Sequence, residues 1–331
     1  MAYRNLKTPP ESPSRTASRR RFRRLPGPNR HPSIVRRPPP PSTMPELPEV
    51  EAIRRHLAST LTNMSIDRAS VRRRDVIRDL GGRRRGRLHP ADLGVGRRVE
   101  MVDRRGKQLI VRLEDGIGIV IRLGMSGRLE LHPRGSRSTS PHRHVVWMLR
   151  GAGTSPETRL DFIDPRRFGG VHLAQSPSDL EERLLAGLGP EAHTIAPETL
   201  YDRLRRTSRS IKTAMLDQSV IAGVGNIYAD EVLFAAGVHP NQPANTISRP
   251  QVKRLADALR VILQKAIEQG GSTIQSHTLP DGGVGNFASH HKVYGRGGLP
   301  CTRCGDSLDR VVLGGRSTTF CATCQGVHPH G

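Results

Sequence analysis

The sequence predicts an α+β protein with several domains: a β-rich N-terminal domain, a helical domain and a small C-terminal module. Three observations support this prediction. Short runs rich in Val, Ile and Leu, separated by turn residues, fill residues 95–175. Apolar residues recur at helical spacing from about residue 178. The chain has four cysteines, in two CxxC pairs near its end. The length of 331 residues fits two domains with some excess.

The first segment, residues 1–44, is basic and rich in proline. It holds 11 Lys and Arg, one acid and 10 of the chain's 26 prolines. Such a composition buries too little apolar surface to offset the entropy of the chain, so we expect a disordered extension. The segment has no apolar stretch like that of a secretory signal, and its prolines oppose the amphipathic helix of a transit peptide.

An amphipathic helix is expected directly after this segment. Apolar residues recur three and four positions apart from Leu47 to Leu61. Pro45 and Glu46 suit the start of a helix, where a missing N–H does no harm and a negative charge is favoured. This explanation accounts for both residues without any chemistry. It does not explain why Met44 precedes them.

The next part of the chain is expected to form strands, and the part after it helices. The turn Glu114–Gly116 between two apolar runs indicates a hairpin. Strands joined by short turns predict an antiparallel sandwich or barrel. The expected strands are residues 108–113, 117–123, 128–132, 144–149, 159–163 and 170–174. The expected helices are residues 180–188, 197–206, 210–217, 226–236 and 249–269.

The cysteines predict a metal site. Their spacing, C-x2-C-x16-C-x2-C, is that of two thiolate pairs closing a tetrahedral zinc site. The alternative, two disulfides in a secreted protein, is disfavoured because no signal peptide is apparent. Four thiolates leave no open position, so this zinc is structural. The insert between the pairs predicts a hairpin around Gly314-Gly315, with Arg316 near its tip. The ligands are Cys301, Cys304, Cys321 and Cys324.

The net charge indicates a polyanionic partner. The formal charge is +23 and the pI is about 11.3, which favours nucleic acid over an anionic membrane surface. No run of about 18 apolar residues is present, so no membrane span is expected. The glycine turn at residues 223–226 opens a helix and would present N–H groups to a phosphate. Many connections between core helices look the same.

Six motifs, taken in order, resemble the formamidopyrimidine-DNA glycosylase family over residues 45–325. They are MPELPEVE, RRGKQL, LGMSGRL, DPRRFGG, AGVGNIYADEVLFAAGVHP and VYGRGGLPCTRC with FCATC. The resemblance implies a β-sandwich catalytic domain (45–176), a helix–two-turn–helix DNA-binding domain with a lesion-capping loop (177–285), a zinc finger (286–325) and a tail (326–331). It also implies one structural Zn²⁺.

The resemblance further implies a bifunctional base-excision repair enzyme. Such an enzyme removes oxidised purines (8-oxoguanine and formamidopyrimidines) from duplex DNA and then cuts the abasic strand by β,δ-elimination. Pro45, freed at its nitrogen, would attack sugar C1′, and Glu46 would shuttle protons. Glu49 would support them, while Lys107 and Arg316 would assist elimination.

The same resemblance assigns DNA contacts. Met125, Arg166 and Phe168 would fill the gap left by a flipped base. His142, Lys212 and Asn226 would grip phosphates together with Lys107 and Arg316. From periodicity alone, Met125 and Phe168 could instead be core residues, and His144 could take the place of His142. The expected partner is double-stranded DNA with oxidised bases or abasic sites, with no membrane partner. The expected protein is a monomer in the bacterial cytoplasm, associated with the nucleoid.

Residues 1–44 conflict with this chemistry, because an amide nitrogen at Pro45 cannot attack. Three explanations are open: translation starts at Met44, the extension is cleaved, or it stays and the lyase is inactive. We expect the first. Two other functions are considered: an endonuclease VIII-like glycosylase for oxidised pyrimidines, and a noncatalytic binder of damaged DNA. The intact DPRRFGG and PELPE motifs argue against the endonuclease VIII-like class.

Overall fold

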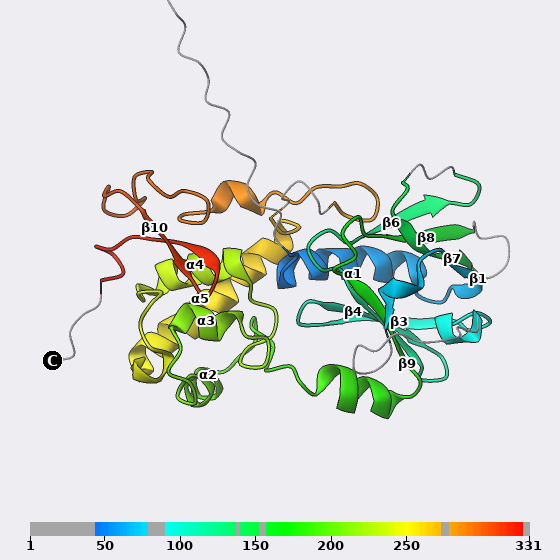
Figure 1. The fold of residues 1–331 in the computed structure, drawn as a ribbon, viewed down its shortest axis with the longest axis horizontal. Helices are drawn as coiled ribbons and strands as arrows, with labels where there is room; N and C mark the ends of the chain where they lie inside the picture. The colour runs from blue at the N-terminus through cyan, green and yellow to red at the C-terminus, as the bar shows by residue number, and fades with distance from the viewer. Residues whose placement is uncertain (1–43, 79–89, 137–139, 152–156, 273–277, 327–331) are drawn as a thin grey trace, which may run out of the picture. The chain divides into compact units, whose positions relative to one another are not determined.

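The computed structural model describes residues 44–78, 90–136, 140–151, 157–272 and 278–326 (Figure 1). The predicted disorder of residues 1–44 therefore falls outside the described residues, apart from Met44. The same holds for residues 273–277 of the predicted capping loop, residues 270–287, and for residues 327–331 of the predicted tail.

The expected first helix is confirmed as α1 (Leu47–Leu61). Glu46 is its N-cap residue and forms a capping box with Glu49. The helix contributes to two hydrophobic cores. Leu47 packs in the core of the helical domain, whereas Val50 and the later apolar residues pack in the core of the sheet domain. The start of α1 therefore lies where the two domains meet.

The N-terminal domain is a sandwich of two sheets, as expected. One sheet has the order β1-β7-β8-β6 and the other β2-β9-β5-β4-β3. All pairs are antiparallel except β2–β9, which is parallel. The strands are β1 (Ser65–Val71), β2 (Ile77–Arg78), β3 (Val99–Arg105), β4 (Gln108–Leu113), β5 (Gly118–Arg122), β6 (Arg128–Pro133), β7 (Arg143–Arg150), β8 (Thr158–Ile163) and β9 (Gly170–Ala174).

The alternation of apolar side chains explains this packing. In β4 and β5, Leu109, Val111, Ile119 and Ile121 point to one face and meet residues such as Phe162 of the opposite sheet. The outer face of the β4–β5 sheet is covered by a π-helical segment at Asp179–Leu185, where a helix was expected. Short 3₁₀ turns occur at Arg74–Val76 and Pro90–Leu93.

The helical domain contains four of the five expected helices as regular α-helices. They are α2 (Pro197–Leu204), α3 (Ile211–Leu216), α4 (Asn226–Ala236) and α5 (Arg249–Glu268). Helix α4 is apolar on nearly all sides and is buried in the centre of the domain core. Further 3₁₀ turns occur at Ala244–Thr246 and Phe287–His290.

The C-terminal module is the expected hairpin between the cysteine pairs, β10 (Asp309–Leu313) and β11 (Arg316–Phe320). Gly314 and Gly315 form its two-residue turn, and both have positive φ, as a type I′ turn requires. The module packs against α4 through a small core that includes Phe234 and Leu308.

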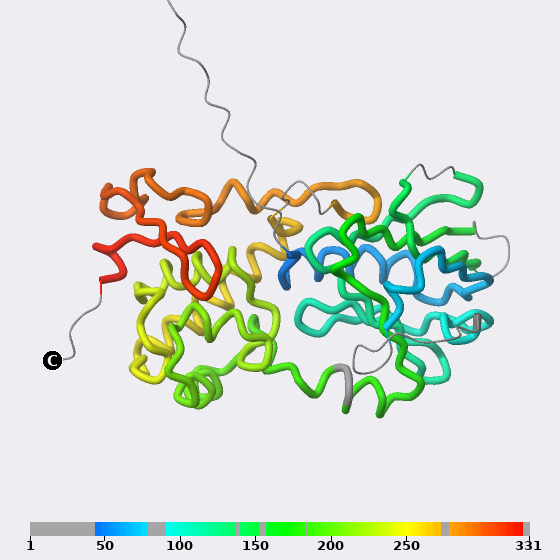
Figure 2. Tube along the Cα trace, viewed as in Figure 1, coloured from blue at the N-terminus to red at the C-terminus, as the bar shows by residue number. Residues whose placement is uncertain are grey.

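The segment between α5 and the module returns to the sandwich (orange in Figure 2). The Leu131 N–H of β6 donates to the carbonyl oxygen of Pro280 at 2.9 Å, and Leu279 packs on the core of the sandwich. Among the described residues, no helix combines the length and the apolar character needed to span a membrane.

Candidate active site

Glu46 is the centre of a buried cluster where α1 meets α4. Its side chain is 1% exposed. Oε2 accepts from Gly225 N–H at 2.7 Å, and Oε1 accepts from Ile227 N–H at 2.8 Å. These N–H groups lie at the start of α4, the positive end of the helix dipole. An ideal Cβ on Gly225 would lie 2.6 Å from Glu46 Oε1, so this position requires glycine.

Glu49, three residues after Glu46 in the chain, also accepts several hydrogen bonds through its carboxylate oxygens. It accepts from Glu46 N–H at 2.9 Å, Tyr228 O–H at 2.7 Å and Ser272 N–H at 2.6 Å. Burial raises the pKa of Glu46 to about 7; nearby Lys107 opposes this shift and Glu49 adds to it. Burial also raises the pKa of Glu49. A carboxyl group with a pKa near neutrality can both give and take a proton at the pH of the cell.

Lys107 joins this cluster from the sandwich. It occupies the second position of the two-residue turn between β3 and β4, after Gly106 with φ 56°. Burial lowers the pKa of Lys107; the carboxylates of Glu46 and Glu49 oppose the shift, and Arg316 of the zinc module adds to it. Lys107, the two glutamates and Arg316 are far apart in the sequence, yet their charges influence one another here.

Glu191, which the sequence analysis missed, anchors the turn that carries Lys107. Its Oε1 accepts from Gly106 N–H at 2.6 Å, and its Oε2 lies 2.8 Å from Arg104 Nη1. Arg104 also contacts Glu51 of α1 at 3.0 Å. Glu191 anchors the turn through contacts between the sandwich and the helical domain. Its local sequence, a single glutamate in a Gly-Pro-Glu stretch, does not indicate such long-range contacts.

Lys212 is fully buried. Its Nζ lies 2.6 Å from Asp230 Oδ1 and donates to Ser317 O at 2.9 Å and to Thr318 Oγ1 at 2.8 Å. Asn226 Nδ2 also donates to Ser317 O, at 3.1 Å. Both side chains thus hold strand β11 just after Arg316. The predicted phosphate contact of Lys212 would need surface that Lys212 does not expose in this structure, and it stays a prediction.

Two adjacent acids of α4 attach the zinc module, and both were missed. Asp230 Oδ2 accepts from Thr319 N–H of β11 at 3.0 Å. Glu231 Oε1 accepts from Val293 and Tyr294 N–H at 3.0 and 2.8 Å. The sequence feature that could have indicated this attachment is the pair of acidic residues inside the apolar run NIYADEVLFAA. A carboxylate buried in such a run needs hydrogen-bond donors from elsewhere in the chain.

Met125, Arg166 and Phe168 lie on two neighbouring loops that Asp164 holds together. Asp164 accepts from Ser126 Oγ at 2.5 Å and from Gly169 N–H at 2.8 Å, and it is fully buried. Phe168 is 58% exposed, and the Arg166 guanidinium lies 4.5 Å from the centre of its ring. Phe168 is therefore not a core residue, and Met125 is only half-buried.

The structure distinguishes the two candidate histidines. His144 is buried, and its Nε2 lies 2.8 Å from the carbonyl oxygen of Asp164. His142 is exposed, next to the loops that Asp164 holds together, because its carbonyl oxygen accepts from Asp164 N–H at 3.1 Å. Only His142 is placed to contact a large ligand.

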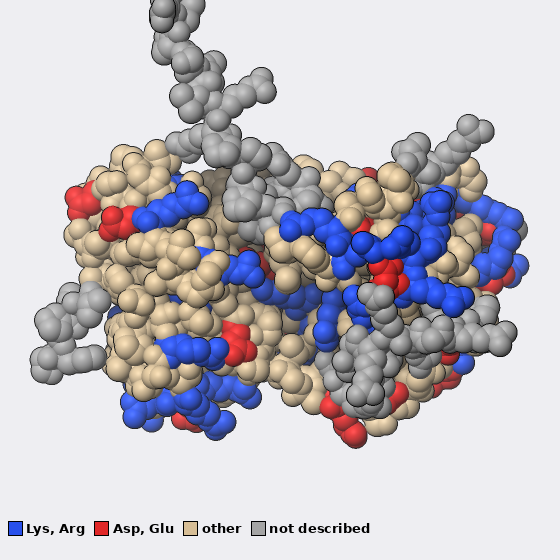
Figure 3. All heavy atoms as spheres, viewed as in Figure 1, with Lys and Arg blue, Asp and Glu red and all other residues tan. Residues whose placement is uncertain are grey.

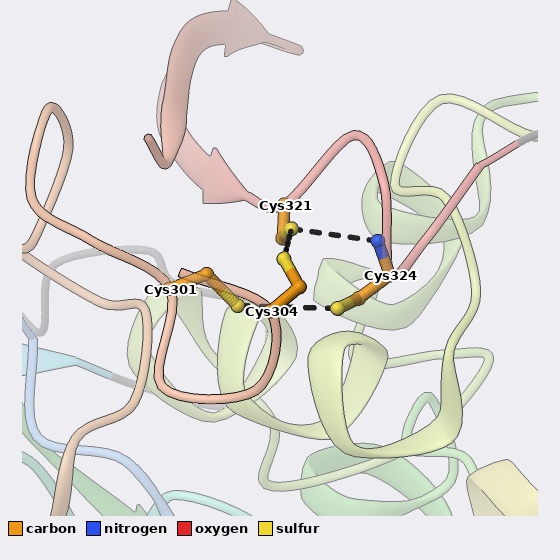
Figure 4. Close-up of side chains that lie close together, drawn as sticks. All are labelled: Cys301, Cys304, Cys321 and Cys324. Atoms are coloured by element: carbon orange, nitrogen blue, oxygen red, sulfur yellow. Dashed lines mark hydrogen bonds between the residues drawn. The ribbon is translucent and has the colours of Figure 1, made fainter. Parts of the chain in front are cut away.

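The four cysteines converge as predicted (Figure 4). Their sulfur atoms all lie within 4.8 Å of one another, and all four thiols are free. The Cys301–Cys324 and Cys304–Cys321 sulfurs are 3.9 and 3.5 Å apart. Tetrahedral zinc with ~2.3 Å bonds needs a separation of roughly 3.8 Å, so the set fits one structural Zn²⁺.

Basic side chains are frequent on the surface of the sandwich seen in Figure 3. Figure 3 shows Lys and Arg spread over this half of the molecule in the viewed face, with few acidic residues between them. Exposed basic residues occur in the β1–β2 connection (Arg72, Arg73 and Arg74) and in the loop that carries Arg166. Such a surface suits a phosphate backbone.

Pro45 is buried directly before Glu46, and Met44 is 42% exposed. The residue predicted as the nucleophile therefore lies next to the carboxyl group whose pKa is near neutrality. Its nitrogen is joined to Met44 in this chain.

Comparisons with known proteins match all three parts of the fold. Residues 44–171 match the formamidopyrimidine-DNA glycosylase N-terminal domain, residues 186–278 its H2TH domain, and residues 298–327 a zinc finger found in FPG and IleRS. A formamidopyrimidine-DNA glycosylase of Thermus thermophilus is 42% identical over 290 residues, which cover 86% of this chain and 100% of the relative.

Solved structures agree. The MutM (Fpg) protein of Thermus thermophilus superposes with a TM-score of 0.73 at 41% identity, covering 86% of this chain and 100% of that one. Lactococcus lactis Fpg in complex with DNA containing an abasic site gives a TM-score of 0.74 at 31% identity, covering 85% and 99%. Other complexes of the Lactococcus protein hold DNA with Fapy-dG or with an oxidised pyrimidine.

A sandwich domain, an H2TH domain and a four-cysteine zinc finger that meet at one carboxylate cluster define a zinc-finger DNA glycosylase of base-excision repair. Within that class, the chain belongs to the formamidopyrimidine-DNA glycosylase family.

Proposed function

We propose that the protein excises oxidised purines, 8-oxoguanine and formamidopyrimidines, from duplex DNA and then cuts the abasic strand by β,δ-elimination. The observation that carries this proposal is the position of Pro45, which directly precedes buried Glu46 at the junction of the domains. The Fapy-dG complex of the Lactococcus relative supports the substrate class.

The chemistry uses the Pro45 nitrogen as a secondary amine. This nitrogen forms a bond to sugar C1′ as the bond from C1′ to the base breaks, and the base leaves with the bonding electrons and takes up a proton. The nitrogen gives up its own proton, and its lone pair then expels O4′ from C1′. O4′ takes up a proton, the sugar ring opens, and a C1′=N iminium forms. The resulting iminium draws electrons from the sugar, which eases loss of the 3′ and then the 5′ phosphate. An α-amino group titrates near ~7.7–8.0, so a useful fraction is unprotonated at neutral pH.

Glu46 supplies and recovers the protons of these steps. Its pKa of about 7 leaves both the acid and the carboxylate populated at neutral pH. We assign Lys107 and Arg316 to the phosphates next to the reacting sugar, with Asn226 and Lys212 supporting the strand that carries Arg316. The exposed Phe168 and Arg166, together with Met125, fill the space left by the flipped base.

This mechanism requires a free amine at residue 45. We propose that the active form begins at Pro45, through translation from Met44 or cleavage of the extension. The N-terminal family model begins at residue 44, and the Thermus relative is covered over 100% of its length. We further propose a monomer that carries domains at 45–176, 177–285 and 286–325.

A covalent trapping experiment tests the proposal. Protein that starts at Pro45 is mixed with an 8-oxoguanine:cytosine duplex and borohydride, in parallel with the full 331-residue chain. We expect a covalent adduct at Pro45 from the shorter protein and none from the full chain, whose Pro45 nitrogen is an amide. No adduct from the shorter protein would refute the Schiff-base mechanism.

A second activity, on oxidised pyrimidines, is favoured by one observation: the Lactococcus relative has been solved with such DNA. A thymine glycol duplex in the same assay measures it. Faster trapping on thymine glycol than on 8-oxoguanine would assign the main activity to oxidised pyrimidines. Binding of both duplexes without trapping would instead indicate a noncatalytic binder of damaged DNA.

A further inference from the structure

A line of hydrogen-bonding side chains leads away from Glu49. Tyr228 O–H donates to Glu49 Oε1 at 2.7 Å, and the Tyr228 oxygen lies 3.3 Å from Ser272 Oγ. Ser272 Oγ in turn lies 2.9 Å from His291 Nε2. The backbone N–H of Ser272 holds Glu49 separately, at 2.6 Å. The tyrosine, the serine hydroxyl and the histidine take no part in the mechanism proposed above.

The line runs from the interior to the surface. Glu49 is 6% exposed, Tyr228 0% and Ser272 3%, whereas His291 is only half-buried. Every member carries a group that can both donate and accept a hydrogen bond, once Glu49 is protonated. No apolar side chain interrupts the line between the carboxyl group and the imidazole.

We propose that Tyr228, Ser272 and His291 form a proton relay that connects the buried Glu49 carboxyl group with solvent. The relay rests on the proposed function, because it supplies protons to Glu49, whose charge acts on Glu46 beside Pro45. Within that function, His291 acts on Glu49 through Ser272 and Tyr228.

The transfer is concerted: each intermediate group gives up its own proton as it receives another, so its charge does not change. With every donor pointing toward Glu49, His291 Nε2–H passes its proton to Ser272 Oγ, Ser272 passes its own to the Tyr228 oxygen, and Tyr228 passes its own to Glu49 Oε1. The imidazole recovers a proton from water at its other nitrogen. The net result is one proton moved from solvent to the carboxylate, and the reverse transfer returns it.

The surroundings of His291 suit a neutral carrier. The rings of Phe287 and Tyr294 pack against it with centres 5.9 and 5.5 Å away. Burial lowers the pKa of His291 to about 4, and neighbouring His290 adds to the lowering. The titratable groups that face His291 are therefore His290, Tyr294 and, through Ser272, Tyr228. A neutral imidazole relays protons by exchanging its two tautomers.

The relay would affect the reaction because the charge of Glu49 changes the pKa of Glu46. Negative charge on Glu49 raises the pKa of Glu46. The proton on Glu49 therefore helps to decide whether Glu46 acts as an acid or as a base. A route through His291 would let Glu49 gain or lose a proton without passing through Pro45 or Glu46.

The test compares His291→Gln and His291→Leu with His290→Gln as the matched control, all in protein that starts at Pro45. Single-turnover base removal is measured from pH 6 to 9, with and without added imidazole. Glutamine can keep the hydrogen bond to Ser272 but cannot exchange tautomers. We expect both His291 variants to lose about tenfold to a hundredfold in rate, with imidazole restoring it, and the His290 variant to match the parent.

Three outcomes would overturn the relay. The His291→Gln rate could equal that of the parent at every pH, in which case no proton passes through this residue. Glutamine could restore what leucine loses, which would show a purely positional role. Imidazole could fail to restore either variant. As a further check, Tyr228→Phe combined with His291→Gln should be no slower than Tyr228→Phe alone, because both break one line. Absence of borohydride adduct in the parent would instead refute the proposed function itself.

Discussion

The change Glu46→Gln should make the protein inactive and yet relatively more stable as the pH rises. Burial raises the pKa of Glu46 to about 7 in the folded state from an ordinary value of 4.5. Since the folded value is the higher one, the favourable contribution of this group is complete below pH 4.5 and is lost as the pH rises through about 7. Glutamine cannot ionise and carries no such dependence.

The size of the effect follows from that shift. Each pKa unit corresponds to ~1.36 kcal/mol, so the move from 4.5 to about 7 is on the order of 3 kcal/mol. The variant also loses one good acceptor for Gly225 or Ile227 N–H, a cost independent of pH. The difference between the two proteins should therefore shift by about 3 kcal/mol in favour of the variant between pH 4.5 and 8.5.

Urea denaturation at a series of pH values measures this difference. Glu51→Gln is the control with the opposite sign. Burial opposes the shift, but hydrogen bonds from Arg54 and Arg104 hold the pKa of Glu51 below its ordinary value, so its contribution is lost as the pH falls. A difference between wild type and Glu46→Gln that stays constant from pH 4.5 to 8.5 would refute the reasoning.

Three further predictions concern other parts of the site. Gly225→Ala would place a Cβ 2.6 Å from Glu46 Oε1; we expect a loss of about 1–3 kcal/mol in urea denaturation and loss of trapping, whereas unchanged trapping would contradict the packing argument. Phe168→Ala should change the free energy of unfolding by less than ~0.5 kcal/mol, because Phe168 is 58% exposed, but it should slow base removal. A loss of ~3–5 kcal/mol in the free energy of unfolding would instead show that Phe168 is a core residue. Removing zinc with a chelator, or Cys321→Ser, should weaken DNA binding in a titration, because the module carries Arg316; unchanged affinity would contradict this.

Much of the fold could be predicted because the patterns that decide it are local. The apolar stripe from Leu47 to Leu61 and the alternation in β4 and β5 each point to one element. Strands β1, β2 and β3 were not among the expected strands. Strand β3, VEMVDRR, lies at a sheet edge and buries only two of its residues. The sequence of β1, SIDRASV, lies at a sheet edge with mostly exposed or half-buried side chains, so it lacks an apolar pattern. The two residues of β2 are recognisable only through their pairing with β9.

The site was less accessible because its geometry depends on long-range partners. Motif position indicated Glu46 and Lys107, but only the folded chain shows how Glu191 holds the Lys107 turn. Lys212 illustrates the opposite case. In the sequence, Lys212 is one of several basic residues that could bind a phosphate. In the structure, its ammonium group forms an ion pair with Asp230. Exposure and pairing of a single cation are set by tertiary contacts that a sequence does not display.

Helix α1 has one consequence for dissecting the enzyme. Its first residue, Leu47, packs under Gly223 of the helical domain, and its N–H donates to the Gly223 carbonyl oxygen at 3.0 Å, while its remaining turns complete the sandwich. A fragment ending before the helical domain would leave Leu47 bare and Glu46 in water, where a carboxyl group titrates near ~4.3. In a fragment cut between the domains, the pKa of Glu46 would therefore no longer be raised toward neutrality. On the proposed mechanism, the part of this chain that performs the chemistry includes both domains and the zinc module that carries Arg316.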